Sequence, residues 1–254
     1  MRVNKFELIL TAVAALALAG CASNPSSANS ASKGWTVDAL TQALATPSRP
    51  QADRDRDANR KPAQLMAYYG VMPGMTALDI FAAGGYLTEV LSITVGPTGK
   101  VYMQNPQMFA GRFPQRLADN RLPNVVAADG DLPNPNVVPL NSVDFAITAM
   151  NFHDVYNRDP AAAKTFLKGV YESLKPGGVL ALIDHAGNEG ADNAKMHRVS
   201  RKAAIDTASA AGFVFEGESD LLAHPADDHT KPVRELEVRG TSDQFALKLR
   251  KPKK

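Results

Sequence analysis

The 254-residue chain is long enough for one domain, or for two small ones, with a substantial hydrophobic core. Its formal net charge of +2 gives no reason to expect a nucleic-acid partner, and its 44% apolar content excludes an intrinsically disordered chain. The single cysteine, Cys21, excludes an internal disulfide framework and a thiolate metal site.

The N-terminal segment, residues 1–20, has the composition of a secretory signal peptide. Arg2 and Lys5 precede an apolar run over residues 8–19, which is too short to span a bilayer comfortably. The run ends in Leu-Ala-Gly-Cys at 18–21, which resembles the lipobox of bacterial lipoproteins. That resemblance implies cleavage before Cys21 and attachment of lipid to this cysteine. The alternative is an ordinary signal peptide followed by a chance cysteine.

The residues after Cys21 indicate where the protein is expected to reside. Ala22 stands in place of the aspartate that resembles an inner-membrane retention signal, so we expect an exported lipoprotein held in the outer membrane and facing the periplasm. Residues 22–34 contain five serines and no large apolar side chain, which is typical of a flexible tether. The predicted organisation is a signal peptide (1–20), a lipidated cysteine with its tether (21–34) and one domain (35–254).

Helical and strand patterns alternate along the predicted domain. Thr36 caps a short helix over 37–45, and a longer helix over 53–69 has a break or restart at Pro62. The charged run 53–57 is interpreted as the solvated start of that helix. Further helices are expected over 86–95, 160–174 and 199–211, with a helical stretch that is interrupted at Pro114. Strands are expected over 76–81, 100–104, 124–128, 143–149, 179–183, 213–216 and 245–249.

Seven strands that alternate with helices predict an α/β fold with a doubly wound, Rossmann-like sheet that is mostly parallel. Right-handed crossovers place the carboxyl ends of parallel strands at one edge of such a sheet. Ligands bind at this edge, where the strand order switches direction. Polar residues that directly follow a strand are therefore the candidates for function.

Three segments carry the functional signal: ALDIFAAGGY at 77–86, NSVDFAITAMNFHDV at 141–155 and SLKPGGVLALIDH at 173–185. Together they resemble class I S-adenosylmethionine-dependent methyltransferases, over nearly all of residues 60–250. The resemblance implies that fold, with a C-terminal antiparallel hairpin, and S-adenosylmethionine as the cofactor. The segment 223–252 resembles an exported branch of predicted methyltransferases. An NAD site is a poorer match, because the pattern G-x-G-x-x-G is missing.

The turn after the first strand is the candidate cofactor loop. Glycine-rich turns of this kind let backbone amides approach a ligand at a helix N-terminus. The family pattern acid-x-Gly-x-Gly-x-Gly is here Asp79, Phe81, Ala83 and Gly85, so two of the three glycines are replaced. With Gly84 these residues form the predicted binding loop, in which Phe81 is expected to block or reshape the pocket.

The other predicted cofactor residues follow later strands. The resemblance assigns Asn105, or less favourably Gln104, to the ribose hydroxyls, where the family has a carboxylate. Asp129 corresponds to the residue that contacts the exocyclic amine of adenine, and Gly130 continues that turn. Asn151, in the second segment, completes the predicted set.

All five histidines lie in the second half of the chain and map to the same sheet edge. His153 and His185 are the candidate catalytic residues, because imidazole titrates near neutrality and methyl transfer often needs a base. Asp154 and Asp184 are expected to orient them. A structural role remains the alternative for any single histidine, and Asp184 could instead cap backbone amides. No residue is assigned to a metal, although histidine and aspartate at one edge also suit zinc or manganese.

The sequence predicts a methyltransferase that uses S-adenosylmethionine and acts on an unknown small-molecule acceptor outside the cytoplasm. The altered loop keeps open a second hypothesis, a non-catalytic ligand-binding lipoprotein on a degenerate methyltransferase scaffold. An exported protein would also need a supply of a cofactor that is made in the cytoplasm. A metal-dependent enzyme that uses the His/Asp edge is the third hypothesis.

Overall fold

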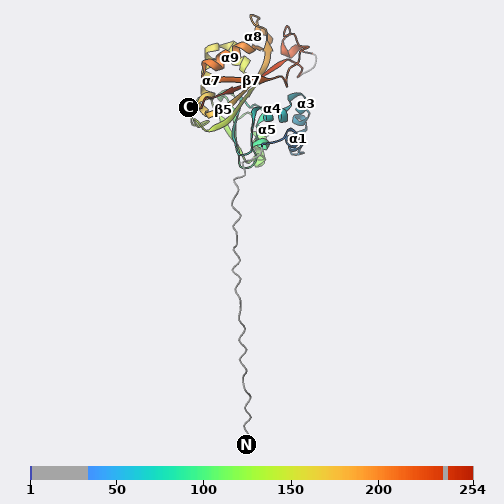
Figure 1. Ribbon diagram of the computed structural model, residues 1–254, viewed down its shortest axis with the longest axis vertical. Coiled ribbons are helices and arrows are strands. Elements are labelled where there is room, and N and C mark those ends of the chain that lie inside the picture. Colours follow the sequence, from blue (N-terminus) through green and yellow to red (C-terminus); the bar gives the residue numbers. More distant parts are fainter. Residues whose placement is uncertain (2–33, 237–239, 254) are drawn as a thin grey trace, which may run out of the picture. The chain divides into compact units, whose positions relative to one another are not determined.

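The computed structural model describes residues 34–236 and 240–253, together with Met1 (Figure 1). The predicted signal peptide, the lipidation site Cys21 and the predicted tether up to residue 33 lie outside the described residues, apart from Met1. From residue 34 onward the described residues belong to one compact unit. Among them, no helix combines the length and the hydropathy that crossing a bilayer requires.

A mixed sheet forms the centre of this unit. Its strands are β1 (Thr76–Ile80), β2 (Lys100–Asn105), β3 (Val125–Asp129), β4 (Val143–Ala149), β5 (Leu174–Gly187), β6 (Val199–Ser200), β7 (Val214–Ser219) and β8 (Gln244–Arg250). The order across the sheet is β3-β2-β1-β4-β5-β8-β7, and the short β6 pairs with β5. The five strands from β3 to β5 are parallel, so the chain switches its winding direction between β1 and β4. The predicted mostly parallel sheet is confirmed, and this switch point is where such sheets bind ligands.

The C-terminal strands complete the sheet in the opposite direction. β8 lies between β5 and β7 and is antiparallel to both. Residues 220–243 connect β7 to β8, so the antiparallel hairpin has a long connection. The C-terminal antiparallel hairpin that the family resemblance implies is confirmed.

Helices precede or follow most of these strands. They are α1 (Val37–Leu44), α2 (Gln51–Arg54), α3 (Asp57–Arg60), α4 (Pro62–Tyr69), α5 (Tyr86–Val95), α6 (Phe152–Arg158), α7 (Pro160–Ser173), α8 (Asn193–Met196) and α9 (Arg201–Ala210), with 3-10 turns η1 (Gln107–Phe109), η2 (Pro114–Asn120) and η3 (Val233–Glu235). The predicted cap of the first helix is present, because Thr36 Oγ1 accepts from Ala39 N at 3.2 Å. Asp159 caps α7 in the same way, with Pro160 in the first turn.

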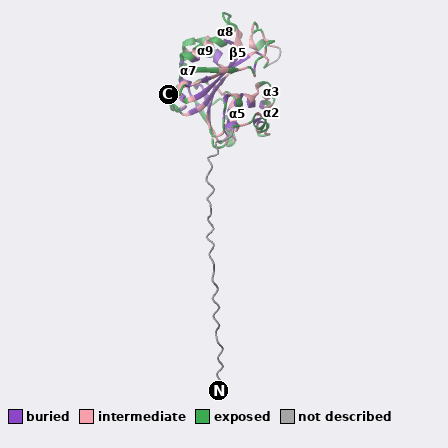
Figure 2. Cartoon of the chain, in the orientation of Figure 1, coloured by how far each residue is buried: buried purple, intermediate pink, exposed green. Residues whose placement is uncertain are grey.

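Both faces of the sheet are buried, and consecutive strand residues alternate between them. In β5, Leu180 and Leu182 pack with α7 and α9, whereas Ala181 and Ile183 pack with α1, α4 and α5. Figure 2 shows the central strands as buried and the outer faces of the helices as exposed. Burial on both faces is the physical reason for the continuous apolar runs in the sequence.

Several predicted elements differ from the structure. The helix predicted over 53–69 is divided into α2, α3 and α4. Lys61, the residue before Pro62, has φ 44° and so lies outside the right-handed helical region, which proline disfavours in the residue before it. The stretch around Pro114 forms 3-10 turns instead of an α-helix. The helix predicted from 199 begins at Arg201, after β6, and Ser200 is its cap. The short helix α6, which carries His153 and Asp154, was not predicted.

Candidate active site

The loop between β1 and α5 keeps a glycine-like backbone although two of its residues are not glycine. Phe81, Ala83 and Gly85 have φ of 54°, 47° and 75°, in the left-handed region that favours glycine. These are the three positions that the family pattern assigns to glycine. The Phe81 ring packs edge-on against Phe166 of α7, with ring centroids 5.5 Å apart. The loop therefore keeps its shape, and the Phe81 ring is held by α7.

We expect the variant Ala83→Gly to raise the free energy of unfolding by about 0.5–1 kcal/mol, because it relieves a left-handed alanine. Ala82→Gly is the matched control, since Ala82 is not among the residues with positive φ. That control should lower the free energy of unfolding by about 0.5–1 kcal/mol through added chain entropy. Urea unfolding of both variants measures the difference, and a loss of stability in both would contradict the prediction.

Two amide side chains at the end of β2 hold this loop in place. Gln104 Oε1 accepts from Phe81 N at 3.1 Å, and Asn105 Oδ1 accepts from Ala83 N at 2.8 Å. Gln104 also donates from Nε2 to Gly130 O at 2.7 Å, which ties the loop after β3 to the same point. Both side chains are buried. Asn105, the predicted ribose contact, thus already serves as a support of the cofactor loop.

A cavity of about 280 Å³ lies at this loop, near the lower end of the range of about 300–1,000 Å³ for ligand sites. Six of the nine predicted cofactor residues line it: Asp79, Phe81, Ala83, Gly84, Gly85 and Asn151. The charged side chains that also line it are Asp53, Arg56, Arg60 and Arg116. The three other predicted residues, Asn105, Asp129 and Gly130, are not in its lining. Asp129 Oδ2 instead accepts from Gly111 N at 2.9 Å.

Asp79 lies beneath this cavity in a water-poor environment. Its side chain accepts from Thr88 Oγ1 at 2.6 Å. Burial raises the pKa of Asp79 to about 7, although the bond from Thr88 and the charges of Arg60 and Arg116 act in the opposite direction. The carboxyl group therefore changes its charge close to neutral pH.

We expect Asp79→Asn to flatten the dependence of stability on pH. Between pH 3.8 and about 7 the folded protein keeps a proton on Asp79 that the unfolded chain has lost, so wild-type stability decreases as the pH rises through this window. Each pH unit in this window lowers the free energy of unfolding by about 1.4 kcal/mol, so the total loss is at most about 4 kcal/mol. Asp206→Asn, at an exposed carboxylate, controls for the loss of one charge. Urea unfolding from pH 4 to pH 8 would contradict the prediction if the stability curves of the wild type and of the Asp79→Asn variant were parallel.

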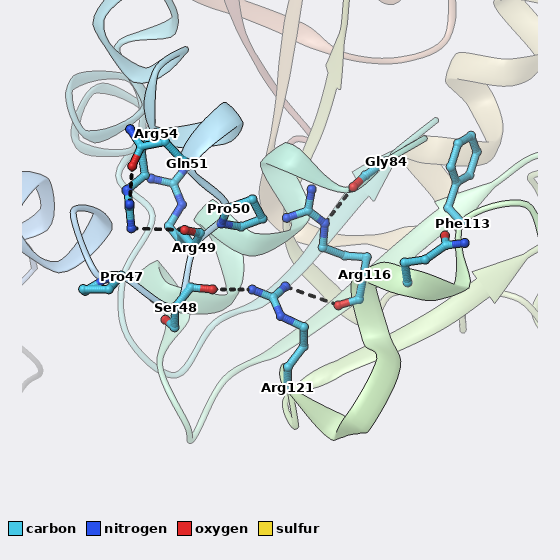
Figure 3. Close-up of a pocket in the computed structure, with 11 residues that line it drawn as sticks. Pro47, Ser48, Arg49, Pro50, Gln51, Arg54, Gly84, Phe113, Arg116 and Arg121 are labelled. Atoms are coloured by element: carbon cyan, nitrogen blue, oxygen red, sulfur yellow. Dashed lines mark hydrogen bonds between the residues drawn. The ribbon is translucent and has the colours of Figure 1, made fainter.

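Arg116 lines this cavity and also a second one, of about 550 Å³ (Figure 3). Its Nη1 pairs with Glu89 of α5, its Nη2 lies 2.7 Å from Asp53 Oδ2 of α2, and its Nε donates to Gly84 O at 2.7 Å. Arg121 reaches the same Glu89, with Nη2 2.5 Å from Oε1, and donates to Ser48 O at 2.8 Å. Figure 3 shows the Arg116 guanidinium bonded to Gly84 of the cofactor loop, and the Arg121 guanidinium between Ser48 and Arg116. Arg116 of η2 thus joins α2 to the cofactor loop and α5, both of which are distant from it in sequence.

The structure corrects the interpretation of 53–57 as a solvated helix start. Asp53 is only 6% exposed because it pairs with Arg116. Asp57 accepts from the fully buried Arg49, with Nη2 3.0 Å from Oδ1, and from Tyr86 Oη at 2.7 Å. Asp53 and Asp57 therefore anchor α2 and α3 near the cofactor loop, whereas Asp55 of the same run is exposed. Sequence reasoning missed this role, since the partner Arg116 is 63 positions away and no local pattern marks it.

The structure brings His153, His185 and His197 together at the carboxyl edge of β4 and β5. The His153 ring centroid lies 5.7 Å from that of His185 and 5.9 Å from that of His197. His229 and His224 lie in the connection from β7 to β8, where both contact Asp243: His229 Nε2 is 2.9 Å from Oδ2, and His224 N donates to Oδ1 at 2.7 Å.

Asp184 fixes the orientation of His153. The fully buried carboxylate accepts from His153 N at 2.8 Å and lies 2.7 Å from His153 Nδ1. It also accepts from His185 N at 2.8 Å, so it caps backbone amides as well. Burial acts to lower the pKa of His153, but the bond and charge of Asp184 outweigh it and raise the pKa above 6.5. The carboxylate makes His153 a stronger base, with Nε2 directed toward Asp154 Oδ1 at 3.3 Å.

His185 has the opposite electrostatic environment. Burial lowers its pKa to about 4, and the nearby His153 and Arg198 act in the same direction. Its Nδ1 lies 2.8 Å from Ser242 Oγ. The His185 ring is therefore neutral at pH 7 and is a weaker base than His153, a difference that the sequence did not indicate.

The strand order, the antiparallel C-terminal strands and the cavity at the switch point define the class I methyltransferase fold. No model of a known protein family matches the chain. In an alignment of 122 residues, the chain is 30% identical to the ubiquinone/menaquinone biosynthesis C-methyltransferase UbiE of Hydrogenovibrio crunogenus. This alignment covers 45% of the chain and 44% of that relative, so the chain matches less than half of the relative's length.

Solved structures resemble most of the chain. A S-adenosylmethionine-dependent methyltransferase from Aquifex aeolicus superposes with a TM-score of 0.58 at 21% identity, over 85% of this chain and 99% of the other. The [4+2]-cyclase SpnF superposes with a TM-score of 0.57 at 18% identity, over 81% of this chain and 85% of the other. These likenesses show the fold. Because a cyclase shares this fold, the fold alone does not define the reaction.

Proposed function

We propose that this chain is a S-adenosylmethionine-dependent methyltransferase that acts on a small-molecule acceptor. The observation that carries the proposal is the cavity at the switch point, whose loop has left-handed φ at each of the three family glycine positions. The 30% identity to a C-methyltransferase over 122 residues supports the same activity.

The cavity fits the charge of the cofactor. Arg56, Arg60 and Arg116 line it, and such cations suit the carboxylate of a bound methionine moiety. Asp79 lies at the same wall and is able to change its charge near neutral pH. Asp129 has two carboxylate oxygens, so its bond to Gly111 N is compatible with a second bond from an adenine amine.

The acceptor is proposed to bind beside His153. Bound S-adenosylmethionine supplies an activated methyl group. His153 Nε2 takes the proton of the acceptor, and Asp184 holds the ring in the orientation that leaves Nε2 available. Asp154 lies beside that nitrogen, and the neutral His185 contributes a polar contact without a charge.

A specific observation favours the alternative of a non-catalytic binding protein. Asn105 replaces the family carboxylate and uses Oδ1 to hold the loop, so its bond to the ribose would lack a full charge. A methyltransferase binds S-adenosylmethionine and turns over an acceptor, whereas the non-catalytic alternative has no turnover and does not require that cofactor.

Calorimetry with S-adenosylmethionine and with its demethylated product tests the proposal. We expect a Kd below about 1 mM for both, within the range of enzyme ligands. Asp79→Ala and Asp129→Ala should weaken binding, whereas Asp206→Ala, an exposed control, should not. No heat signal at millimolar ligand would overturn the methyltransferase, and unchanged affinity in both site variants would show that the pocket lies elsewhere.

We also propose that the protein acts outside the cytoplasm as a lipoprotein anchored in the outer membrane through Cys21. The support is the lipobox-like segment 18–21. Cys21→Ser should release the protein from membranes, and mass spectrometry should find lipid only on the wild type. A wild-type protein without lipid would contradict the anchor.

A further inference from the structure

Three side chains at the histidine cluster bring possible metal-ligand atoms close to one another. His153 and Asp154 lie on α6, and His197 follows α8. Each offers one nitrogen or oxygen atom, and these atoms all lie within 4.8 Å of one another. His153 is buried, whereas the side chains of Asp154 and His197 are 65% and 40% exposed. The cluster thus has one buried side chain, that of His153, and two side chains that solvent can reach.

The spacing of these atoms fits a tetrahedral metal ion. Bonds of about 2.0–2.1 Å place two ligand atoms about 3.3 Å apart in a tetrahedral zinc site, and His153 Nε2 lies 3.3 Å from Asp154 Oδ1. His197 Nδ1 is 3.8 Å from the same oxygen, and the ligand atoms of the three residues lie within 4.8 Å of one another, so this exposed ring has to move closer to complete the site. Two imidazoles and one carboxylate are a donor set that divalent transition metals prefer.

The surroundings of His153 are those of a metal ligand. Asp184 is fully buried, and its carboxylate accepts a hydrogen bond from Nδ1–H at 2.7 Å, which leaves the lone pair of the neutral ring on Nε2. A carboxylate on the far nitrogen is the common partner of a metal-bound histidine, because it sets the tautomer and raises ligand basicity.

One contact opposes metal binding in the structure as it stands. Arg234 Nη2 lies 2.6 Å from His197 Nε2, and a guanidinium can only donate. The neutral ring then carries its proton on Nδ1, the atom that faces Asp154. A metal on Nδ1 requires the other tautomer, so the metal and Arg234 exclude each other.

We propose that His153 Nε2, Asp154 Oδ1 and His197 Nδ1 bind a divalent transition-metal ion such as Zn²⁺, with Asp184 as the supporting carboxylate and Arg234 as a competitor. Three protein ligands leave at least one coordination position open. An acceptor oxygen at that position would have a lowered pKa and would lose its proton to solvent, which reaches the exposed Asp154 and His197, so His153 would then be a metal ligand and not the base. This role in catalysis rests on the proposed function, whereas metal binding itself does not.

Metal titration of the chelator-treated full chain, without S-adenosylmethionine, tests the proposal. The probes are Co²⁺, followed by its visible absorption, and Zn²⁺, followed by calorimetry. We expect one ion per chain. Asp184→Asn should weaken Zn²⁺ about 10- to 100-fold, as is typical for outer partners of metal ligands, and His197→Ala at least as much. Arg234→Gln should strengthen binding, which no merely structural role of Arg234 predicts.

His224→Ala is the matched control, because His224 lies at the same edge but outside the three-residue cluster. It should leave the Zn²⁺ affinity unchanged. His197 is partly exposed, so its variant is expected to fold, and circular dichroism verifies this. Unchanged Zn²⁺ affinity in His197→Ala, or weaker binding in Arg234→Gln, would overturn the site. Cofactor calorimetry with a chelator present reports separately on the methyltransferase, so the two proposals fail independently.

Discussion

Arg116→Ala is expected to lower the free energy of unfolding by about 3 kcal/mol, because it removes a paired cation from two buried carboxylates, Glu89 and Asp53. The side chains of Glu89 and Asp53 are only 3% and 9% exposed. Arg121 still contacts Glu89 and Arg56 still lies 3.4 Å from Asp53, so the loss is placed at the lower end of the range for broken buried pairs. For a domain of this size the melting temperature should fall by about 6–12 °C.

The same substitution should also weaken cofactor binding, because Arg116 lines the cavity and donates to Gly84 O in its loop. Arg201→Ala is the matched control, since its pair with Glu218 is exposed and should contribute at most about 1 kcal/mol. Urea unfolding and calorimetry measure both effects. If Arg116→Ala were as stable as Arg201→Ala, the network of Arg116, Glu89 and Asp53 would not hold the loop.

Asp184→Asn is expected to change the proton on His153 and, with it, turnover. The amide carries no charge, so the pKa of His153 should fall below its ordinary value of 6.5, where burial alone would place it. An amide N–H that faces Nδ1 also favours the tautomer with the proton on Nε2, which is then unable to accept one. We expect kcat to fall by roughly 10²–10⁴-fold, the usual contribution of general acid–base catalysis, with little change in cofactor affinity.

Nitrogen NMR of the His153 ring measures its tautomer and its pKa without an acceptor, and the pH profile of turnover follows once an acceptor is identified. Asp144→Asn is the control, because Asp144 is a paired carboxylate at the opposite end of β4 and contacts Lys175 at 2.7 Å. The His153 signals of the Asp144→Asn variant should match those of the wild type. An unchanged tautomer and pKa in Asp184→Asn would remove Asp184 as a positioning residue and leave it a cap of backbone amides.

The sheet could be predicted because its signal is local. Residues 179–183 are apolar without interruption, and in the structure they alternate between the two buried faces of the sheet. The position of the loop between β1 and α5 was predicted in the same way, from a turn that follows such a run. What could not be predicted is that Phe81 and Ala83 keep the left-handed backbone of glycine. Tertiary packing, including the contact of Phe81 with Phe166, outweighs the local preference there.

The charged residues show the limit of sequence reasoning most clearly. Asp53 lies in a run of alternating charges that is typical of a solvated helix, yet it is buried because Arg116 approaches from 63 positions away. The histidines were placed at the correct edge, since strand ends can be predicted, but His153 and His185 could not be ranked. The pKa of His153 is raised by its contact with Asp184, and the pKa of His185 is lowered by burial; only the fold creates these two environments.

The sequence by itself determined the α/β class, the strand positions and the edge at which function is expected. These depend on the spacing of apolar residues and on turns, which act over a few neighbouring positions. The tertiary structure alone decided which charges are paired, which histidine is the stronger base and which three side chains meet within reach of one metal ion. Which side chains pair depends on distances between strand ends and helices that are far apart in the chain. Local composition does not indicate these distances.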